Sequence, residues 1–211
     1  DRRRNGMICG MGAVAMVLER AEMADERGVI PLVELVDTEI ANSAFHGTRL
    51  DVSHVQSVVK RAVDRFCDIE ELSSSEMGER VVFMSHETYT PPRGGSAAAE
   101  VEALRHAFGS SAEQVLIANT KGMTGHPMGA GLEDAVVIKS LQYNTAPPIP
   151  NLKEPDPELG VLNLSDGSTH KRDYALRFAA GFGSQIAIAC FKKVADGDHR
   201  IADQSKHQEW L

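Results

Sequence analysis

The chain has little of what several large classes of protein require. Its 22 lysines and arginines stand against 30 aspartates and glutamates, giving a formal charge of −8, whereas a nucleic-acid-binding domain needs a basic footprint. No run of about 18 consecutive apolar residues is present, which argues against a membrane-spanning helix. The cysteines Cys9, Cys67 and Cys190 are odd in number and widely spaced, unlike a disulfide framework. We therefore expect a cytoplasmic location, with no nucleic-acid and no membrane partner.

An initiator methionine is also absent, because the chain opens on Asp1. The arginines at positions 2–4 carry the charge of a signal peptide, but a glycine-punctuated stretch without a cleavage pattern follows them. Its 211 residues suffice for one substantial core. We expect the chain to be a piece of a longer protein.

Apolar periodicity predicts helices that alternate with strands. Helices are expected over 19–27, 51–66, 97–108 and 132–143, and strands over 29–36, 81–84, 114–118, 174–179 and 185–194. Residues 13–18 are interpreted as a buried strand, although periodicity alone leaves a helix open there, and 73–75 as a polar connector. This order predicts an α/β domain in which helices cover a largely buried mixed sheet, with 195–211 as a polar tail or linker.

Several familiar motifs fail on their context. Residues 10–15 (GMGAVA) match G-x-G-x-x-A, but no strand precedes them as a dinucleotide-binding turn requires. His86-Glu87 begins like a zincin helix, yet Thr90 stands where the second histidine belongs and two prolines follow. There is no G-x-S-x-G elbow, no P-loop and no paired-cysteine metal site, so no metal is expected. Each cysteine is interpreted as a packed hydrophobic residue.

Two similar sites survive this selection. The apolar strand 81–84 leads directly to His86, and the strand 114–118 leads to a glycine-rich segment that contains Lys121 and His126. Binding residues gather at strand ends in α/β folds, so the two histidines are candidates for one common site. An isolated histidine in a loop can equally serve only to satisfy local hydrogen bonds.

Four segments, in this order, resemble the carboxy-terminal half of the β-ketoacyl synthases, condensing enzymes of the thiolase-like superfamily. The segments are 1–19 with its Arg4, Gly6, GMGA and VLE; 86–91 (HETYTP) with the helix start 100–104 (EVEAL); 121–126 (KGMTGH); and 181–183 (GFG). The resemblance covers residues 1–194. It implies one half of the duplicated α-β-α-β-α sandwich of that superfamily.

The resemblance also implies an acyltransferase reaction, the decarboxylative Claisen condensation of an acyl thioester with a malonyl-type extender in fatty acid or polyketide synthesis. By the same resemblance, His86 and His126 are catalytic, because a neutral imidazole can donate an N–H to the developing enolate oxygen. Lys121 would help to keep both imidazoles neutral. Thr88 and Thr90 match positions that hydrogen-bond the pantetheine arm, and Phe182 matches a phenylalanine that gates acyl entry, with Gly181 and Gly183 giving the turn its freedom.

The partners implied are an acyl carrier protein, whose phosphopantetheine arm carries the substrate, and a second copy of the chain in a homodimer; no directly bound cofactor is expected. The nucleophilic cysteine of the family lies at a helix start in the amino-terminal half. Cys9, Cys67 and Cys190 do not match that context. We therefore expect this piece to be inactive alone and to need the missing amino-terminal half, about as long as itself.

The sequence departs from the family pattern at four places. Glu87 replaces a glycine beside His86, Tyr89 adds bulk, the stretch 92–99 is longer, and Ser184 replaces a glycine after the turn. These departures leave open a non-catalytic module for dimerisation or carrier-protein docking. A thiolase is a weaker alternative, because Cys190 lies in an apolar strand, and a hydrolase lacks an activated serine or cysteine.

Overall fold

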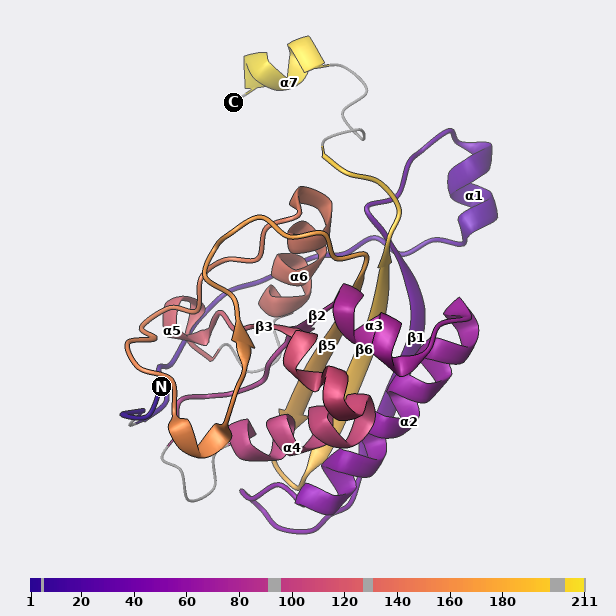
Figure 1. The fold of residues 1–211 in the computed structure, drawn as a ribbon. Helices are drawn as coiled ribbons and strands as arrows, with labels where there is room; N and C mark the ends of the chain where they lie inside the picture. Colours follow the sequence, from indigo (N-terminus) through magenta and orange to yellow (C-terminus); the bar gives the residue numbers. More distant parts are fainter. Residues whose placement is uncertain (5, 91–95, 127–130, 198–203, 211) are drawn as a thin grey trace.

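The computed structural model describes residues 1–4, 6–90, 96–126, 131–197 and 204–210. In these residues six strands form a sheet in the order β1-β6-β5-β2-β3-β4 (Figure 1). The strands β2, β3 and β5 run parallel, β4 runs parallel to β3, and β6 is antiparallel to both β5 and β1. The strands are β1 (Val33–Asn42), β2 (Val81–Met84), β3 (Leu116–Ala118), β4 (Asn163–Leu164), β5 (Tyr174–Gly181) and β6 (Gln185–Lys193).

Helices cover both faces of this sheet. The α-helices are α1 (Ala21–Glu26), α2 (Val52–Glu70), α3 (Ser74–Arg80), α4 (Ser96–Phe108), α5 (Lys121–Thr124), α6 (Leu132–Tyr143) and α7 (Gln204–Trp210). Figure 1 shows α2, α3 and α4 on one side of the sheet and α6 on the other, while α7 lies apart from it. The mixed sheet between helices confirms the predicted α/β class.

The two faces of β5 show how period-2 alternation builds two cores. Leu176 and Phe178 belong to the larger core, which α2 and α4 cover, whereas Ala175 belongs to the smaller core beneath α6. Arg177 has the same parity as Ala175, so a strand that is otherwise apolar in this stretch presents one charged side chain toward α6.

Most of the predicted elements are present, with shifted ends. The amphipathic helix predicted from residue 51 is α2, whose amino-terminal cap is Asp51 accepting from His54 N. The helix predicted over 132–143 is α6. The predicted strand 29–36 starts later and continues further, as β1, because its partner β6 offers a ladder from Lys193 back to Gln185.

Two predictions were wrong. Residues 73–75 are no connector: Ser73 and Glu76 form a capping box that starts α3, a signature of serine followed three residues later by glutamate. Residues 13–18 form no strand and no helix. An apolar run becomes a buried strand only where a neighbouring strand accepts its hydrogen bonds, and no described strand pairs with this segment.

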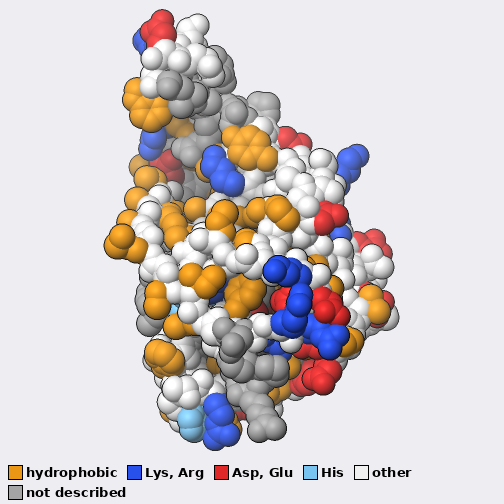
Figure 2. All heavy atoms as spheres, turned by 90° about the vertical axis from the view of Figure 1, so that its left-hand side faces the viewer, with side chains coloured by type: hydrophobic (Ala, Val, Ile, Leu, Met, Phe, Trp, Pro, Cys, Tyr) orange, Lys and Arg blue, Asp and Glu red, His pale blue; other side chains and the backbone are white. Residues whose placement is uncertain are grey.

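The segment 7–18 is consequently open to solvent. Met11 is 97% exposed, Val17 91% and Leu18 72%, values that buried strand residues never show. Figure 2 shows a broad field of hydrophobic side chains on the side of the molecule from which the amino terminus starts. Contiguous exposed apolar surface of this kind commonly marks an interface. Among the described helices, none has the length and apolar character that crossing a membrane requires.

Candidate active site

The two histidines predicted to share a site meet at the carboxyl ends of the parallel strands. His86 follows β2 after one residue, and His126 follows the short helix α5, which comes after the neighbouring strand β3. Their rings have centroids 5.5 Å apart and are inclined at 75°. Nδ1 of His126 is buried and has no hydrogen-bond partner in the part of the chain that the structure describes. The histidines therefore form a pair, as the sequence predicted, with a ring nitrogen unpaired.

Burial and nearby positive charges favour the uncharged form of both imidazoles. Burial lowers the pKa of His86 to about 2, and the positive charges of Lys121 and Arg177 act in the same direction. His126 is half-buried, and burial followed by the charge of Lys121 likewise lowers its pKa. A neutral imidazole carries one N–H donor and one acceptor nitrogen. At neutral pH the pair can therefore donate hydrogen bonds without contributing charge.

Lys121, which lies near the histidines, forms a buried ion pair. Its Nζ lies 2.7 Å from Oε1 of Glu133, in the first turn of α6. Burial lowers the pKa of Lys121, while Glu133 opposes this. Burial alone would raise the pKa of Glu133, but Lys121 and then Arg177 bring it below its usual range. The predicted role of Lys121 thus depends on Glu133, a partner that the sequence analysis missed.

Asn119 joins the two histidine loops. Its amide Nδ2 donates to the carbonyl oxygens of Ser85 (3.3 Å) and Glu87 (2.9 Å), on either side of His86. Its Oδ1 accepts from the backbone N of Lys121 at 2.9 Å. One buried side chain therefore sets the position of the His86 loop relative to the start of α5. A polar residue directly after a buried strand was the available signal for it.

A buried carboxyl group accepts hydrogen bonds from the backbone of His86 and from the residue before it. Oε2 of Glu100 accepts from the hydroxyl of Ser85 at 2.6 Å and from the backbone N of His86 at 3.2 Å. Burial raises the pKa of Glu100 to about 7, although the hydrogen bond from Ser85 favours the charged form. Both Glu100 and Glu133 occupy the buried stripe of their helices, four residues before Leu104 and Val137 respectively. An acidic residue on an apolar stripe was the sequence signal for each.

Glu87 turns its carboxylate away from the histidines and toward α4. Its Oε2 accepts from the backbone N of Ala97 at 2.6 Å and from the hydroxyl of Ser96 at 3.1 Å, while Oε1 accepts from Tyr89 N at 2.8 Å. Its side chain also lies 3.9 Å from Nε of buried Arg4. The residue that departs from the family pattern therefore binds its own loop to the start of α4. Of the stretch 92–99, which the resemblance suggested to be longer, residues 92–95 lie outside the described part and residues 96–99 belong to α4.

The other predicted site residues follow the carboxyl ends of β2 and β5, which are parallel neighbours in the sheet. Thr88 and Thr90 are half-buried, with hydroxyl oxygens 3.4 Å apart. Phe182 is 65% exposed in the turn between β5 and β6. Gly183 adopts φ 81°, which a glycine accommodates, but Gly181 has no left-handed backbone, so its predicted freedom is not used. Ser184 adopts φ 59°, and its buried Oγ accepts from the backbone N of Asp51.

The glycines of the amino-terminal motif serve close packing. A Cβ added to Gly10 would lie 2.1 Å from the carbonyl oxygen of Thr124. Beside this crossing, the backbone N of His126 donates to Ile8 O at 2.8 Å. The segment that matched a dinucleotide-binding turn therefore packs directly against the His126 loop and helps to set the position of that loop. The close approach of the two backbones explains why position 10 is a glycine.

The cysteines lie in different surroundings. Cys67 and Cys190 are buried, and burial raises the pKa of the first to about 11 and of the second to about 12. Both thiols therefore resist forming the thiolate that acts as a nucleophile, as their interpretation as packed residues implies. Cys9 is exposed, contrary to that interpretation, because its segment is uncovered.

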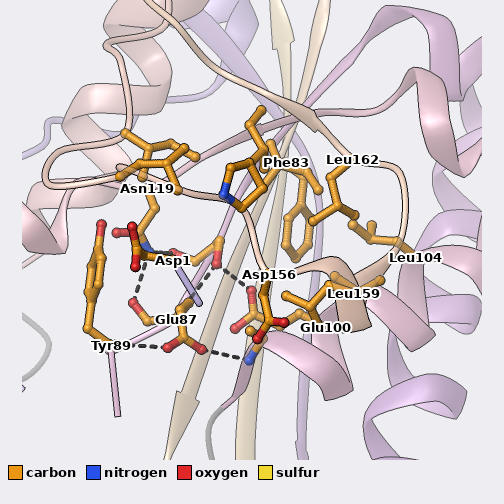
Figure 3. A pocket seen from close by; sticks show the side chains of 18 residues that line it. Asp1, Phe83, Glu87, Tyr89, Glu100, Leu104, Asn119, Asp156, Leu159 and Leu162 are labelled. Atoms are coloured by element: carbon orange, nitrogen blue, oxygen red, sulfur yellow. Dashed lines mark hydrogen bonds between the residues drawn. The ribbon is translucent and has the colours of Figure 1, made fainter. Parts of the chain in front are cut away.

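A cavity of about 80 Å³ lies beneath the His86 loop, between α4 and the connection that precedes β4. Figure 3 shows Asn119, Tyr89 and Glu87 on one side of it and Phe83, Leu104 and Leu162 on the other. Neither histidine lines it. The cavity thus lies behind the loop and is separate from the site at which the imidazoles meet. In the described residues, no group of three or more His, Cys, Asp and Glu side chains is placed to hold a metal ion.

Comparisons with known proteins point to the same family as the motifs. Residues 85–153 match the family model for the β-ketoacyl synthase C-terminal domain. The chain is 32% identical over 201 residues to 3-oxoacyl-[acyl-carrier-protein] synthase 2 of Vibrio harveyi. This match covers 93% of this chain and 46% of that relative. The chain therefore spans about half the length of the curated relatives it matches.

Two solved structures show the corresponding likeness in three dimensions. A β-ketoacyl synthase from Burkholderia phymatum STM815 aligns with a TM-score of 0.68 and 25% identity, over 83% of this chain and 41% of that one. The ishigamide ketosynthase/chain length factor aligns with a TM-score of 0.77 over 92% of this chain and 46% of that one, and its 21% identity shows the fold alone.

Proposed function

We propose that this chain, the carboxy-terminal half of a β-ketoacyl synthase, supplies the two-histidine side of an active site for decarboxylative Claisen condensation. The substrates are an acyl thioester and a malonyl-type extender carried on a protein, in fatty acid or polyketide synthesis. The observation that carries the proposal is the pair His86 and His126, whose ring centroids lie 5.5 Å apart at the strand ends and whose pKa values are lowered by burial. The relative in Vibrio harveyi is named as a synthase of the same reaction type.

The chemistry follows from the charge state of the pair. When a malonyl thioester loses carbon dioxide, the electron pair of the breaking C–C bond moves toward the thioester carbonyl and negative charge develops on its oxygen. Two neutral imidazoles that donate N–H groups to this oxygen stabilise the enolate as it forms. The enolate carbon then attacks the acyl carbonyl, and the thiolate of the nucleophile leaves. Lys121 contributes by positioning and by charge, because its ammonium group is engaged with Glu133.

The nucleophile is assigned to an amino-terminal half outside these 211 residues. Cys67 and Cys190 are buried with raised pKa values, and Cys9 lies in an isolated bridge with His126 and not at the start of a helix. The exposed apolar segment 7–18 supports this assignment, because it offers a surface for such a half to cover. We assign residues 1–194 to the condensing domain and 195–211 to a tail, which contains α7.

Further parts of the proposal concern binding. The hydroxyls of Thr88 and Thr90 would bind the phosphopantetheine arm of an acyl carrier protein, and Phe182 would lie beside the acyl chain. A second copy of the synthase completes a homodimer. The carrier-protein part is supported by the name of the Vibrio harveyi relative, 3-oxoacyl-[acyl-carrier-protein] synthase 2.

The test uses the synthase polypeptide that contains this segment. His86→Ala and His126→Ala should each lower the rate of carbon dioxide release from a malonyl thioester by at least about 100-fold, the usual scale for a lost oxyanion donor. His106→Ala, an exposed histidine on α4, is the matched control and should leave the rate unchanged. Full activity in both active-site variants would overturn the proposal and favour a non-catalytic module.

Mass spectrometry checks the assignment of the nucleophile. The 211-residue chain, incubated with an acyl thioester, should remain unacylated at all three cysteines. Stoichiometric acylation of Cys9, Cys67 or Cys190 would contradict the placement of the nucleophile in another half of the protein.

A further inference from the structure

A second buried cation lies beside the Lys121–Glu133 ion pair. Arg177 is in β5, where it pairs in register with Met84, the last residue of β2 before the His86 loop. Its Nη2 lies 3.4 Å from Oε2 of Glu133, and its Nε lies 3.4 Å from Oδ1 of Asp134. Nη1 donates to the carbonyl oxygen of Phe178. With 8% of its surface exposed, the guanidinium is almost completely enclosed.

The ion cluster of Lys121, Arg177, Glu133 and Asp134 has a defined division of contacts. Lys121 holds Oε1 of Glu133, and Arg177 holds Oε2. Because each oxygen has its own cation, the carboxylate cannot turn without losing one of the two contacts. The position of the Lys121 ammonium beside the histidines is therefore determined partly from β5.

The cluster is a poor device for stability alone. Removing charges from water costs free energy, and a buried ion pair is often no more stabilising than well-packed apolar residues. Ala175, two residues earlier on the same face of β5, is such an apolar residue. A charged side chain at position 177 is thus better explained by what it does to its neighbours than by its own contribution to folding.

The charges of the two cations differ in permanence. Lysine loses its charge readily when it is buried, and burial lowers the pKa of Lys121. A guanidinium stays protonated in folded proteins. Arg177 therefore supplies a positive charge near the imidazoles at every pH at which the protein folds.

We propose that Arg177 is a positioning residue of the condensation site, which fixes the Lys121–Glu133 pair behind His86 and His126 and places a permanent positive charge beside the two imidazoles. The inference rests on the proposed function, because it assigns Arg177 a task in that reaction. It adds a residue that no motif in the sequence pointed to.

The titratable and charged groups around His126 come from each element packed near it. They are Lys121 on α5, Glu133 and Asp134 on α6, Arg177 on β5, His86 after β2 and Cys9 on the amino-terminal segment, with Glu100 on α4 acting through Lys121. The positive members lower the pKa of His126 and Glu133 raises it. Removing Arg177 takes away one positive member and leaves its two carboxylates with less compensation, so both changes favour a protonated imidazole.

Histidine titration by NMR tests this in the 211-residue chain. Arg177→Met should raise the midpoint of the His126 titration by about 1 pH unit, a usual size for the loss of one nearby charge. Arg177→Gln, which keeps a hydrogen-bond donor for Glu133, should give the same shift and serves if the methionine variant does not fold. Arg177→Lys should restore most of the original midpoint.

Arg80→Met is the matched control, because Arg80 also pairs with a carboxylate, Asp173 at 2.9 Å, but belongs to α3. It should leave the His126 midpoint unchanged. An unmoved midpoint in folded Arg177→Met or Arg177→Gln would overturn the proposal, as would an equal shift in the control.

A second measurement separates this inference from the proposed function. In the complete synthase, Arg177→Met should move the acid limb of the pH–rate profile to higher pH by about 1 unit, because the rate needs neutral imidazoles. Loss of rate in His86→Ala with an unmoved acid limb in Arg177→Met would reject the role of Arg177 alone. A shifted NMR midpoint without any condensation activity would reject the proposed function alone.

Discussion

Replacing Glu87 with alanine removes the acceptor for three hydrogen bonds at once. The backbone N–H groups of Tyr89 and Ala97 and the hydroxyl of Ser96 all donate to its carboxylate, at 2.8, 2.6 and 3.1 Å. Ala97 belongs to the first turn of α4, where N–H groups lack partners inside the helix. The substitution therefore opens the His86 loop and removes the acceptor at the start of α4 together.

The expected loss can be worked from these contacts. A capping interaction contributes about 1 kcal/mol, and a hydrogen bond to a charged group about 1.5–3 kcal/mol before screening. The side chain of Glu87 is 14% exposed, so water replaces part of what is lost. We expect the free energy of unfolding of Glu87→Ala to fall by about 2–3 kcal/mol, and that of Glu87→Gln by about half as much, since its amide keeps one acceptor oxygen.

Urea unfolding followed by circular dichroism measures this change. The matched control is Glu102→Ala on the exposed side of α4, where the carboxylate accepts one bond from Gln56 at 3.3 Å. That substitution should change the free energy of unfolding by less than about 0.5 kcal/mol. If Glu87→Ala behaved like Glu102→Ala, the carboxylate would not hold the loop, and its replacement of a glycine would need another reason.

Two further predictions concern stability. Burial raises the pKa of Glu100 to about 7, above about 4.3 in the unfolded chain, so the folded state holds the extra proton between these values and stability falls as the pH rises through them. Glu100→Gln should therefore exceed the parent in unfolding free energy by up to about 3 kcal/mol at pH 8, and an equal difference at pH 4 would contradict this. Gly10→Ala should destabilise by at least about 2 kcal/mol and perturb the NMR signals of the His126 loop, because its Cβ would meet Thr124 O at 2.1 Å. Gly47→Ala, with open space around it, should do neither, and equal effects would refute the packing argument.

The sequence predicts best where one local signal decides the structure. The helix α2 and the strand before His86 were predicted from the apolar pattern of their own residues alone. The two histidine motifs were recognised because they follow each other in the order of the family that they resemble. The prediction of a strand over 13–18 was wrong for the opposite reason. A strand needs a neighbouring strand as its hydrogen-bond partner, and a local pattern does not show whether one is present. The start of α3 was missed although Ser73 and Glu76 carried the capping signature.

The charged support of the site was harder to predict. Glu133 and Arg177 lie 44 positions apart in the chain, and nothing local indicates that α6 and β5 bring them together. The role of Glu87 was beyond sequence reasoning for a related reason. A carboxylate beside a candidate catalytic histidine suggests interference, and only the hydrogen bonds of its side chain show that it binds the start of α4.

The amide of Asn119 has a consequence for how such a site can change during evolution or in the laboratory. Because it holds carbonyl groups on both sides of His86 and the first N–H of α5, the two histidine loops are geometrically dependent on each other. We expect additional residues after His86 to be tolerated where they enter beyond this anchor. Transplanting either histidine loop from a related protein should accordingly succeed when both loops and the asparagine are moved as one unit.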